Sequence, residues 1–237
     1  MIMSQTRIIP IFPLDLVLFP NQDLPLKIFE PRYKQMIDDC MISEKEFGVC
    51  LSNSQMTVSN WEAPYNIGTI AKIIDCKDVS VTSGHLHINT KGHNRFRIIK
   101  IIPPCIEQPA DYDPFSLDGI KKIDNLHQDI GTHGKMYIQA EVELINEIEE
   151  SISLQEWNFL IELWKRKITQ LAKPQSISPY ELDNLLERYY LKTEIPTLDY
   201  VYSLCALGAS SPKELQLILE SATKEQLLEK CKNLFKN

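Results

Sequence analysis

The sequence predicts an α+β protein in which a β module, residues 1–147, precedes a C-terminal α-helical bundle, residues 148–237. Two observations support this order. In the first part, short runs such as 86–89 and 137–144 alternate apolar with polar side chains, which favours antiparallel strands with one solvated face. From Ser151 onward, apolar residues recur every three or four positions, which is the period of a helix. A run of strands followed by a run of helices is typical of the α+β class.

The strands expected in the β module are separated by turns rich in glycine, proline or aspartate. They cover residues 7–11, 24–29, 47–51, 67–74, 79–81, 85–90, 95–102 and 137–144. One helix is expected over 31–42, because Pro31 suits the first helical position and the apolar residues from Tyr33 to Cys40 follow at helical spacing. Residues 103–135 lack a clear periodicity and are predicted to form a long loop, with a short helix near 119–128.

The first helix of the bundle has a clear apolar seam. Its members are Trp157, Ile161, Trp164, Ile168 and Leu171, spaced alternately by four and three residues. Four helix starts carry the signature of a capping box, with Glu or Gln three positions after Ser153, Ser178, Ser211 and Thr223. Together with a further helix over 197–207, these signals predict five helices joined by short loops.

Composition and charge narrow the class of protein. The six cysteines are scattered singly without a C-x-x-C pair, and no apolar run approaches the roughly 20 residues of a membrane span. The N-terminus has no apolar core of a secretory signal, so we expect a cytoplasmic protein with reduced cysteines. The first 150 residues hold 14 Lys and Arg against 21 Asp and Glu, and thus carry the whole net charge of −7. This charge disfavours nucleic acid as a partner.

Five segments of the β module occur in the order seen in a known family. They are Phe12-Pro13-Leu14 with Leu18-Phe19-Pro20, Phe29-Glu30-Pro31-Arg32-Tyr33, Phe47-Gly48-Val49, Gly68-Thr69, and Gly92 with Arg95-Phe96. Together they resemble the N-terminal, substrate-binding domain of Lon proteases, as a stand-alone bacterial-type protein without the ATPase and peptidase modules. The resemblance implies a PUA-like β pseudo-barrel with one helix, followed by a helical bundle. It also implies a role in recruiting unfolded or tagged proteins.

The residues that carry the resemblance are predicted to be structural, because apolar, glycine and proline positions mostly belong to cores and turns. Glu30 and Arg32 flank the start of the helix over 31–42, where a carboxylate is favourable and the two side chains can pair. The full set is Pro13, Leu14, Phe19, Pro20, Phe29, Glu30, Arg32, Tyr33, Phe47, Gly48, Gly68, Gly92, Arg95 and Phe96.

Recognition of an unfolded client requires exposed apolar surface or an open strand edge. The predicted substrate-binding residues are four that the turn-rich pattern leaves poorly covered, namely Leu16, Leu18, Trp61 and Tyr65. Trp61 has an equally supported structural interpretation, in which it plugs the space beneath a loop.

The motifs of catalytic and metal-dependent proteins are missing. The sequence has neither a G-x-x-x-x-G-K-[ST] phosphate loop nor a G-x-S-x-G elbow. His85, His87 and His93 could share one strand face and hold zinc, but no thiol or carboxylate with suitable spacing accompanies them. We therefore expect no catalytic residue, no metal and no cofactor.

The expected function is a non-catalytic protein- or peptide-recognition module that serves as an adaptor for proteolysis or quality control. Its expected partners are unfolded or tagged protein segments, with a protease or chaperone as a further partner and no membrane. The alternative is a PUA-like RNA-binding protein that relies on the basic cluster of Lys91, Arg95, Arg97 and Lys100. Four charges on an acidic module would give weak, salt-sensitive binding at most.

Overall fold

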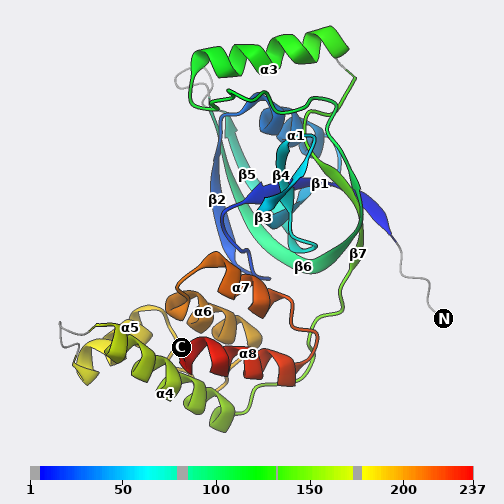
Figure 1. The fold of residues 1–237 in the computed structure, drawn as a ribbon. Helices are drawn as coiled ribbons and strands as arrows, with labels where there is room; N and C mark the ends of the chain where they lie inside the picture. Colours follow the sequence, from blue (N-terminus) through cyan, green and yellow to red (C-terminus); the bar gives the residue numbers. More distant parts are fainter. Residues whose placement is uncertain (1–5, 79–84, 132, 173–177, 237) are drawn as a thin grey trace. The chain divides into compact units, whose positions relative to one another are not determined.

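The computed structural model describes residues 6–78, 85–131, 133–172 and 178–236. The chain divides into two compact units, residues 1–146 and 147–237, each considered separately below (Figure 1). Seven strands and one seven-stranded sheet lie in the described part of the first unit, and seven helices are distributed over the two units. The mixed α+β class predicted from the sequence is therefore confirmed. The strand expected over 79–81 lies outside the described residues.

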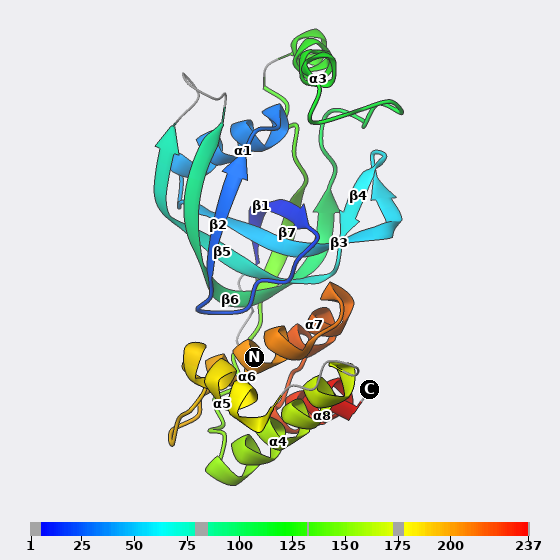
Figure 2. The same ribbon diagram turned by 90° about the vertical axis from the view of Figure 1, so that its left-hand side faces the viewer.

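The sheet of the first unit closes on itself. Its strands are β1 (Arg7–Leu14), β2 (Asp23–Ile28), β3 (Glu46–Val58), β4 (Trp61–Pro64), β5 (Ile67–Asp78), β6 (Leu86–Ile102) and β7 (Gln139–Leu144). They run in the order β1-β7-β6-β5-β3-β4, and a parallel pairing of β1 with β3 joins the two sides into a ring. All other pairings are antiparallel. The long, curved β6 crosses the whole unit and also pairs with β2 (Figure 2).

Helix α1 (Pro31–Met41) supplies one wall of the core. It begins with proline at its first position and buries Tyr33, Met36, Ile37 and Cys40, as the helical spacing predicted. These side chains pack against Phe12, Phe47 and other buried residues of the sheet. A second apolar cluster forms around Phe96 from residues of β1, β3, β5, β6 and β7. The helix and the ring of strands thus enclose the core of the first unit.

Two glycines of the predicted structural set are required by close backbone approaches. A Cβ atom on Gly92 would lie 2.3 Å from the carbonyl oxygen of Phe19, and one on Gly68 would lie 2.4 Å from that of Val49. Real Cβ atoms do not approach a backbone oxygen so closely, so these positions exclude every other residue unless the backbone moves.

Most of the aromatic residues of the set belong to the core, with one exception. Phe19, Phe47 and Phe96 are fully buried. Phe29 is half-buried, so its expected place in the core is wrong. It directly follows the end of β2 and turns toward a neighbouring segment instead of the sheet interior. Arg95 is buried, and its guanidinium donates to the carbonyl of Asn146 at 3.4 Å.

The segment 103–135 contains more order than the sequence predicted. Helix α3 (Leu117–Ile130) begins before and ends after the short helix expected near 119–128. Its N-cap is Ser116, whose hydroxyl accepts from the backbone N–H of Gly119 at 3.0 Å. Both views show α3 on the same side of the unit as α1 (Figures 1 and 2). Ile123 of α3 is buried in a small cluster with Trp61, Ile106 and Met136, which fixes the segment to the sheet.

The second unit consists of helices with short connections. They are α4 (Leu154–Leu171), α5 (Pro179–Arg188), α6 (Leu198–Gly208), α7 (Pro212–Leu219) and α8 (Lys224–Lys236). Trp157 and Trp164 of the predicted seam are fully buried. No helix within the described residues combines the length and the apolar character that crossing a membrane requires.

Two of the four predicted capping boxes form in full, and a third forms in part. Ser153 and Ser178 make complete capping boxes with Glu156 and Glu181. At α8, the hydroxyl of Thr223 accepts from the N–H of Gln226, but the amide oxygen of Gln226 accepts from the N–H of Ala222, so only half of the box forms. Ser211 differs, because its side chain makes no cap bond. Glu214, three positions on, accepts from the N–H of Ser210 at 2.6 Å, so this carboxylate reaches one residue further back than the motif predicts.

Candidate functional site

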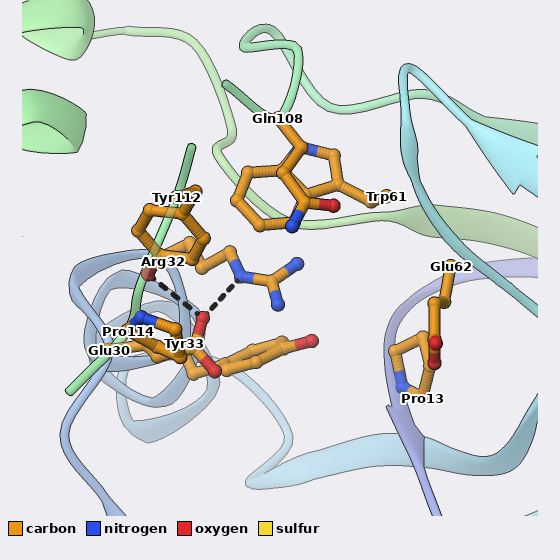
Figure 3. A pocket seen from close by; sticks show the side chains of 9 residues that line it. All are labelled: Pro13, Glu30, Arg32, Tyr33, Trp61, Glu62, Gln108, Tyr112 and Pro114. Atoms are coloured by element: carbon orange, nitrogen blue, oxygen red, sulfur yellow. Dashed lines mark hydrogen bonds and ion pairs between the residues drawn. The ribbon is translucent and has the colours of Figure 1, made fainter. Parts of the chain in front are cut away.

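A pocket of about 270 Å³ opens in the first unit where α1, β1 and β4 meet the segment that follows β6. Figure 3 shows its side chains, which come from four separate stretches of the chain. The residues are Pro13, Glu30, Arg32, Tyr33, Trp61, Glu62, Gln108, Tyr112 and Pro114. The pocket therefore depends on the tertiary fold, because the lining residues lie as much as a hundred positions apart in the sequence.

Arg32 is the centre of the pocket. Its guanidinium carbon lies 3.7 Å from the ring centroid of Trp61 and 4.2 Å from that of Tyr33. Its Nε atom donates to Oε2 of Glu30 at 2.8 Å, and the two side chains are only 13% and 14% exposed. The pairing predicted for Glu30 and Arg32 is therefore confirmed. A cation held between two aromatic faces and a carboxylate is fixed in position by several partly desolvated interactions.

Tyr112, 82 residues after Glu30 in the sequence, also bonds to the Glu30–Arg32 ion pair. Its hydroxyl donates to the same Oε2 atom of Glu30 at 3.1 Å. Burial, and after it the charge of Glu30, raises the pKa of Tyr112 far above its usual range, so the phenol stays protonated and remains a donor. Burial likewise raises the pKa of Tyr33. The Glu30 carboxylate thus receives two hydrogen bonds, one from Arg32 and one from Tyr112.

Trp61 is a wall of the pocket and is itself anchored. Its indole Nε1 donates to the carbonyl of Ile106 at 2.8 Å, and the ring of Tyr112 meets it edge-on at a centroid distance of 5.2 Å. Trp61 is only 2% exposed. The expectation that the turn-rich pattern leaves it uncovered is therefore wrong, and the interpretation as a plug beneath a loop describes its packing. Its indole face is nevertheless part of the pocket wall.

The other three residues predicted to bind substrate do not line this pocket. Leu18 is 3% exposed and lies in the core around α1, so its expected exposure is also wrong. Leu16 packs against the same core and is partly buried, as is Tyr65. Sequence reasoning assigned Glu30, Arg32 and Tyr33 a structural role only. It did not single out Tyr112, whose signal was an aromatic residue in an otherwise acidic, proline-containing segment.

An exposed aromatic pair borders the pocket. The rings of Phe29 and Phe115 stack at a centroid distance of 5.0 Å, and Phe115 is 79% exposed. The chain neighbours of these two residues, Glu30 and Pro114, both line the pocket, so the pair and the pocket are adjacent. Leu117, two positions after Phe115, is 74% exposed. We call Phe29, Phe115 and Leu117 the apolar ledge. Exposed apolar residues gathered beside a pocket are typical of binding surfaces.

The structure also places the histidines considered for zinc binding and the basic cluster considered for RNA binding. Among the described residues, no group of three or more His, Cys, Asp and Glu side chains is arranged to hold a metal ion, and His85, His87 and His93 form no such group. The exposed members of the basic cluster lie opposite acidic residues. Lys91 is paired in register with Asp23, Arg97 with Glu143, and Lys100 with Glu141.

Comparison with solved structures shows which class of protein has this fold. The chain is similar to a Lon N-terminal domain protein from Xanthomonas campestris, with 21% identity and a TM-score of 0.56 over 94% of this chain and 95% of that one. It is also similar to the N-terminal domain of the Lon protease of the Mycobacterium avium complex, with 14% identity and a TM-score of 0.53 over 98% and 99% of the two chains. A model of one family, described as the ATP-dependent protease La (LON) substrate-binding domain, matches residues 8–237. The chain belongs to this family, as its five sequence segments indicated.

Proposed function

We propose that this protein is a non-catalytic recognition module that binds unfolded or tagged polypeptide segments and serves as an adaptor in proteolysis or quality control. Membership of the substrate-binding family supports the general role in recognition. The observation that carries the proposal is the apolar ledge beside the Arg32 pocket. The ring of Phe115 is 79% exposed, so it stabilises the fold much less than a buried ring would. It instead gives a client an apolar surface to cover.

The pocket supplies polar specificity beside this apolar surface. Figure 3 shows the terminal nitrogens of Arg32 directed toward the centre of the pocket, on the side of Glu62 and Pro13. Glu30, Tyr33 and Trp61 hold the guanidinium from the other sides, so it is oriented before any client arrives. A few fixed polar groups next to an apolar surface select the register of a bound segment, because a mismatched segment leaves them unpaired.

The lining of the pocket supports a non-catalytic role. None of the nine lining residues is a Ser, Cys, Lys or His, so the pocket lacks the side chains that most often serve as nucleophiles, and its carboxylates are those of Glu30 and Glu62. The Glu30 carboxylate is occupied by Arg32 and Tyr112. The ring of β1, β3, β5, β6 and β7, with one helix packed on its core, also supports the PUA-like pseudo-barrel that the resemblance implies, as the five helices of the second unit support the helical bundle.

RNA binding is supported less well. Arg95 of the basic cluster is buried, and each of the other three basic residues faces an acidic partner across the sheet. Phosphate binding needs several accessible cations, and here each exposed one has a carboxylate residue at the paired position of a neighbouring strand.

Replacement of Phe115 by serine tests the proposal. The ring is exposed, so Phe115→Ser leaves the fold intact but weakens binding of a permanently unfolded protein by about tenfold, a typical loss for an aromatic anchor. Binding is followed by fluorescence anisotropy of labelled, reduced and carboxymethylated α-lactalbumin. Phe159→Ser is the matched control, since this ring of α4 is 48% exposed and lies in the other unit. Unchanged affinity in a Phe115→Ser, Leu117→Ser double variant would refute the assignment of the ledge.

A further inference from the structure

The helical unit contains a second and larger cavity, which the proposed function does not use. It has a volume of about 640 Å³ and lies between α4, α5 and the turn that follows α5. Apolar side chains from Trp157, Ile161 and Leu186 contribute to its wall together with charged and polar ones. The polar lining residues are Asn158, Glu162, Lys165, Asp183, Lys192, Thr193 and Glu194. We call this space the α4–α5 cavity.

One residue of the cavity wall, Trp157, has a donor without a partner among the described residues. Trp157 is fully buried, and its indole Nε1 makes no hydrogen bond within the described part of the chain. A buried indole N–H normally finds an acceptor, because leaving it unpaired in a protein interior is unfavourable. Because the Trp157 ring is fully buried, this N–H lies behind the surface of the cavity wall and is not open to a ligand.

The charges of the cavity leave one carboxylate available. Lys165 bridges Asp183 at 2.9 Å and Glu162 at 3.7 Å, and Lys192 pairs with Glu187 at 3.3 Å. Glu194 has no ion-pair partner among the residues that the structure describes. The cavity therefore complements a cation, since its two lysines are already neutralised and an exposed carboxylate remains.

The chain around the cavity also presents apolar side chains to solvent. Tyr190 is 83% exposed and Ile195 is 80% exposed, and both are close in sequence to lining residues. Tyr190 adopts φ 55°, a left-handed conformation that glycine takes far more readily at the end of a helix. A large, solvated side chain kept in a strained conformation contributes little to the fold, and such positions cluster at binding sites.

We propose that the α4–α5 cavity is a second binding site, for an extended polypeptide segment that carries a lysine or arginine side chain. The cation pairs with Glu194, and the ring of Tyr190 offers it a cation–π contact. The apolar part of the segment lies against Ile195 and Ile161. Charge complementarity selects this occupant over an acidic or purely apolar one.

The test compares two short fluorescein-labelled peptides with the same apolar residues, one with arginines and one with glutamates at the charged positions. At low salt, the arginine peptide binds the full chain and the glutamate peptide does not. Glu194→Lys weakens binding of the arginine peptide by about tenfold. Glu229→Lys is the matched control, because it makes the same charge reversal at an exposed position of α8 that does not line the cavity.

Tyr190→Gly separates binding from stability. It weakens binding of the arginine peptide by a similar factor. The melting temperature of the protein does not fall, because glycine adopts the left-handed conformation without strain. Equal binding of both peptides, or no effect of Glu194→Lys, would overturn the proposal. It would also be overturned if sedimentation equilibrium showed a dimer of this chain that Tyr190→Gly dissociates, because the occupant would then be a second copy. The ledge variant Phe115→Ser leaves peptide binding unchanged, so this site and the proposed client site can fail independently.

Discussion

Replacement of Arg32 by methionine tests the central contacts of the pocket. Methionine keeps an unbranched apolar side chain of similar reach but removes the charge. The substitution deletes the ion pair to Glu30 and the contacts with the Trp61 and Tyr33 rings. The Glu30 carboxylate, 14% exposed, then keeps only the hydrogen bond from Tyr112.

The expected loss follows from these contacts. Breaking a fully buried ion pair by removing one partner costs about 3–5 kcal/mol, and the residual exposure of both groups here reduces this to about 2 kcal/mol. Loss of the cation–π contacts adds about 1 kcal/mol. The free energy of unfolding of the first unit should therefore fall by about 3 kcal/mol in Arg32→Met. Glu30→Gln should cost about 1 kcal/mol, because the amide oxygen still accepts from both partners.

Urea denaturation monitored by Trp61 fluorescence measures these values. All variants carry Trp157→Phe and Trp164→Phe, so that the fluorescence of Trp61 reports the first unit alone. The double variant Arg32→Met, Glu30→Gln closes a thermodynamic cycle. Its loss in free energy of unfolding should be smaller than the sum of the two single losses by at least about 1 kcal/mol. The reason is that the double variant no longer contains the carboxylate that Arg32→Met leaves unpaired. Strict additivity, or a loss below about 1 kcal/mol in Arg32→Met, would show that the ion pair does not act as a unit.

Three further predictions concern the fold. Gly92→Ala should destabilise the first unit by about 3 kcal/mol or prevent soluble expression, because its Cβ would meet the Phe19 carbonyl at 2.3 Å; urea titration or soluble yield measures this. Ser153→Ala should lower the stability of the second unit by about 1 kcal/mol in thermal melts, whereas Ser211→Ala should have almost no effect because its side chain makes no cap bond. Hydrogen bonds from Ser153 hold the pKa of Glu156 below its usual range. The stability that they contribute is therefore present above the usual carboxyl pKa and is lost as the pH falls through the lowered folded-state pKa. The difference in melting temperature between wild type and Ser153→Ala should therefore narrow in acid, and a constant difference would contradict this account.

Features set by local sequence could be predicted. The helix expected over 31–42 is observed as Pro31–Met41, since proline at its start and the spacing of its apolar residues are both local signals. The capping boxes at Ser153 and Ser178 form for the same reason. The β3–β4 hairpin was not predicted. Its turn uses Ser59 and Asn60 with φ of 50° and 66°, and lacks the glycine that usually marks such a turn.

The pocket could not be predicted, because its contacts join distant parts of the chain. Trp61 appeared to have no partner in its polar surroundings, yet its indole bonds to Ile106, 45 residues away. Glu30 meets Tyr112 across 82 residues. Periodicity reports which face of one element is buried, but not which other element covers it. The same limit explains why the sequence could not decide between an exposed and a buried Trp61.

The double pairing of β1 has a consequence for the order of events during synthesis. Arg7 of β1 pairs with Val142 of β7, while Ile11 pairs with Gly48 of β3. A growing chain therefore holds its first strand with one edge unsatisfied until the last strand has left the ribosome, and helix α3 must emerge in between. Such long-range closure slows folding and leaves an edge open to neighbouring chains. The nascent form of this substrate-binding domain is thus itself a candidate for protection by chaperones.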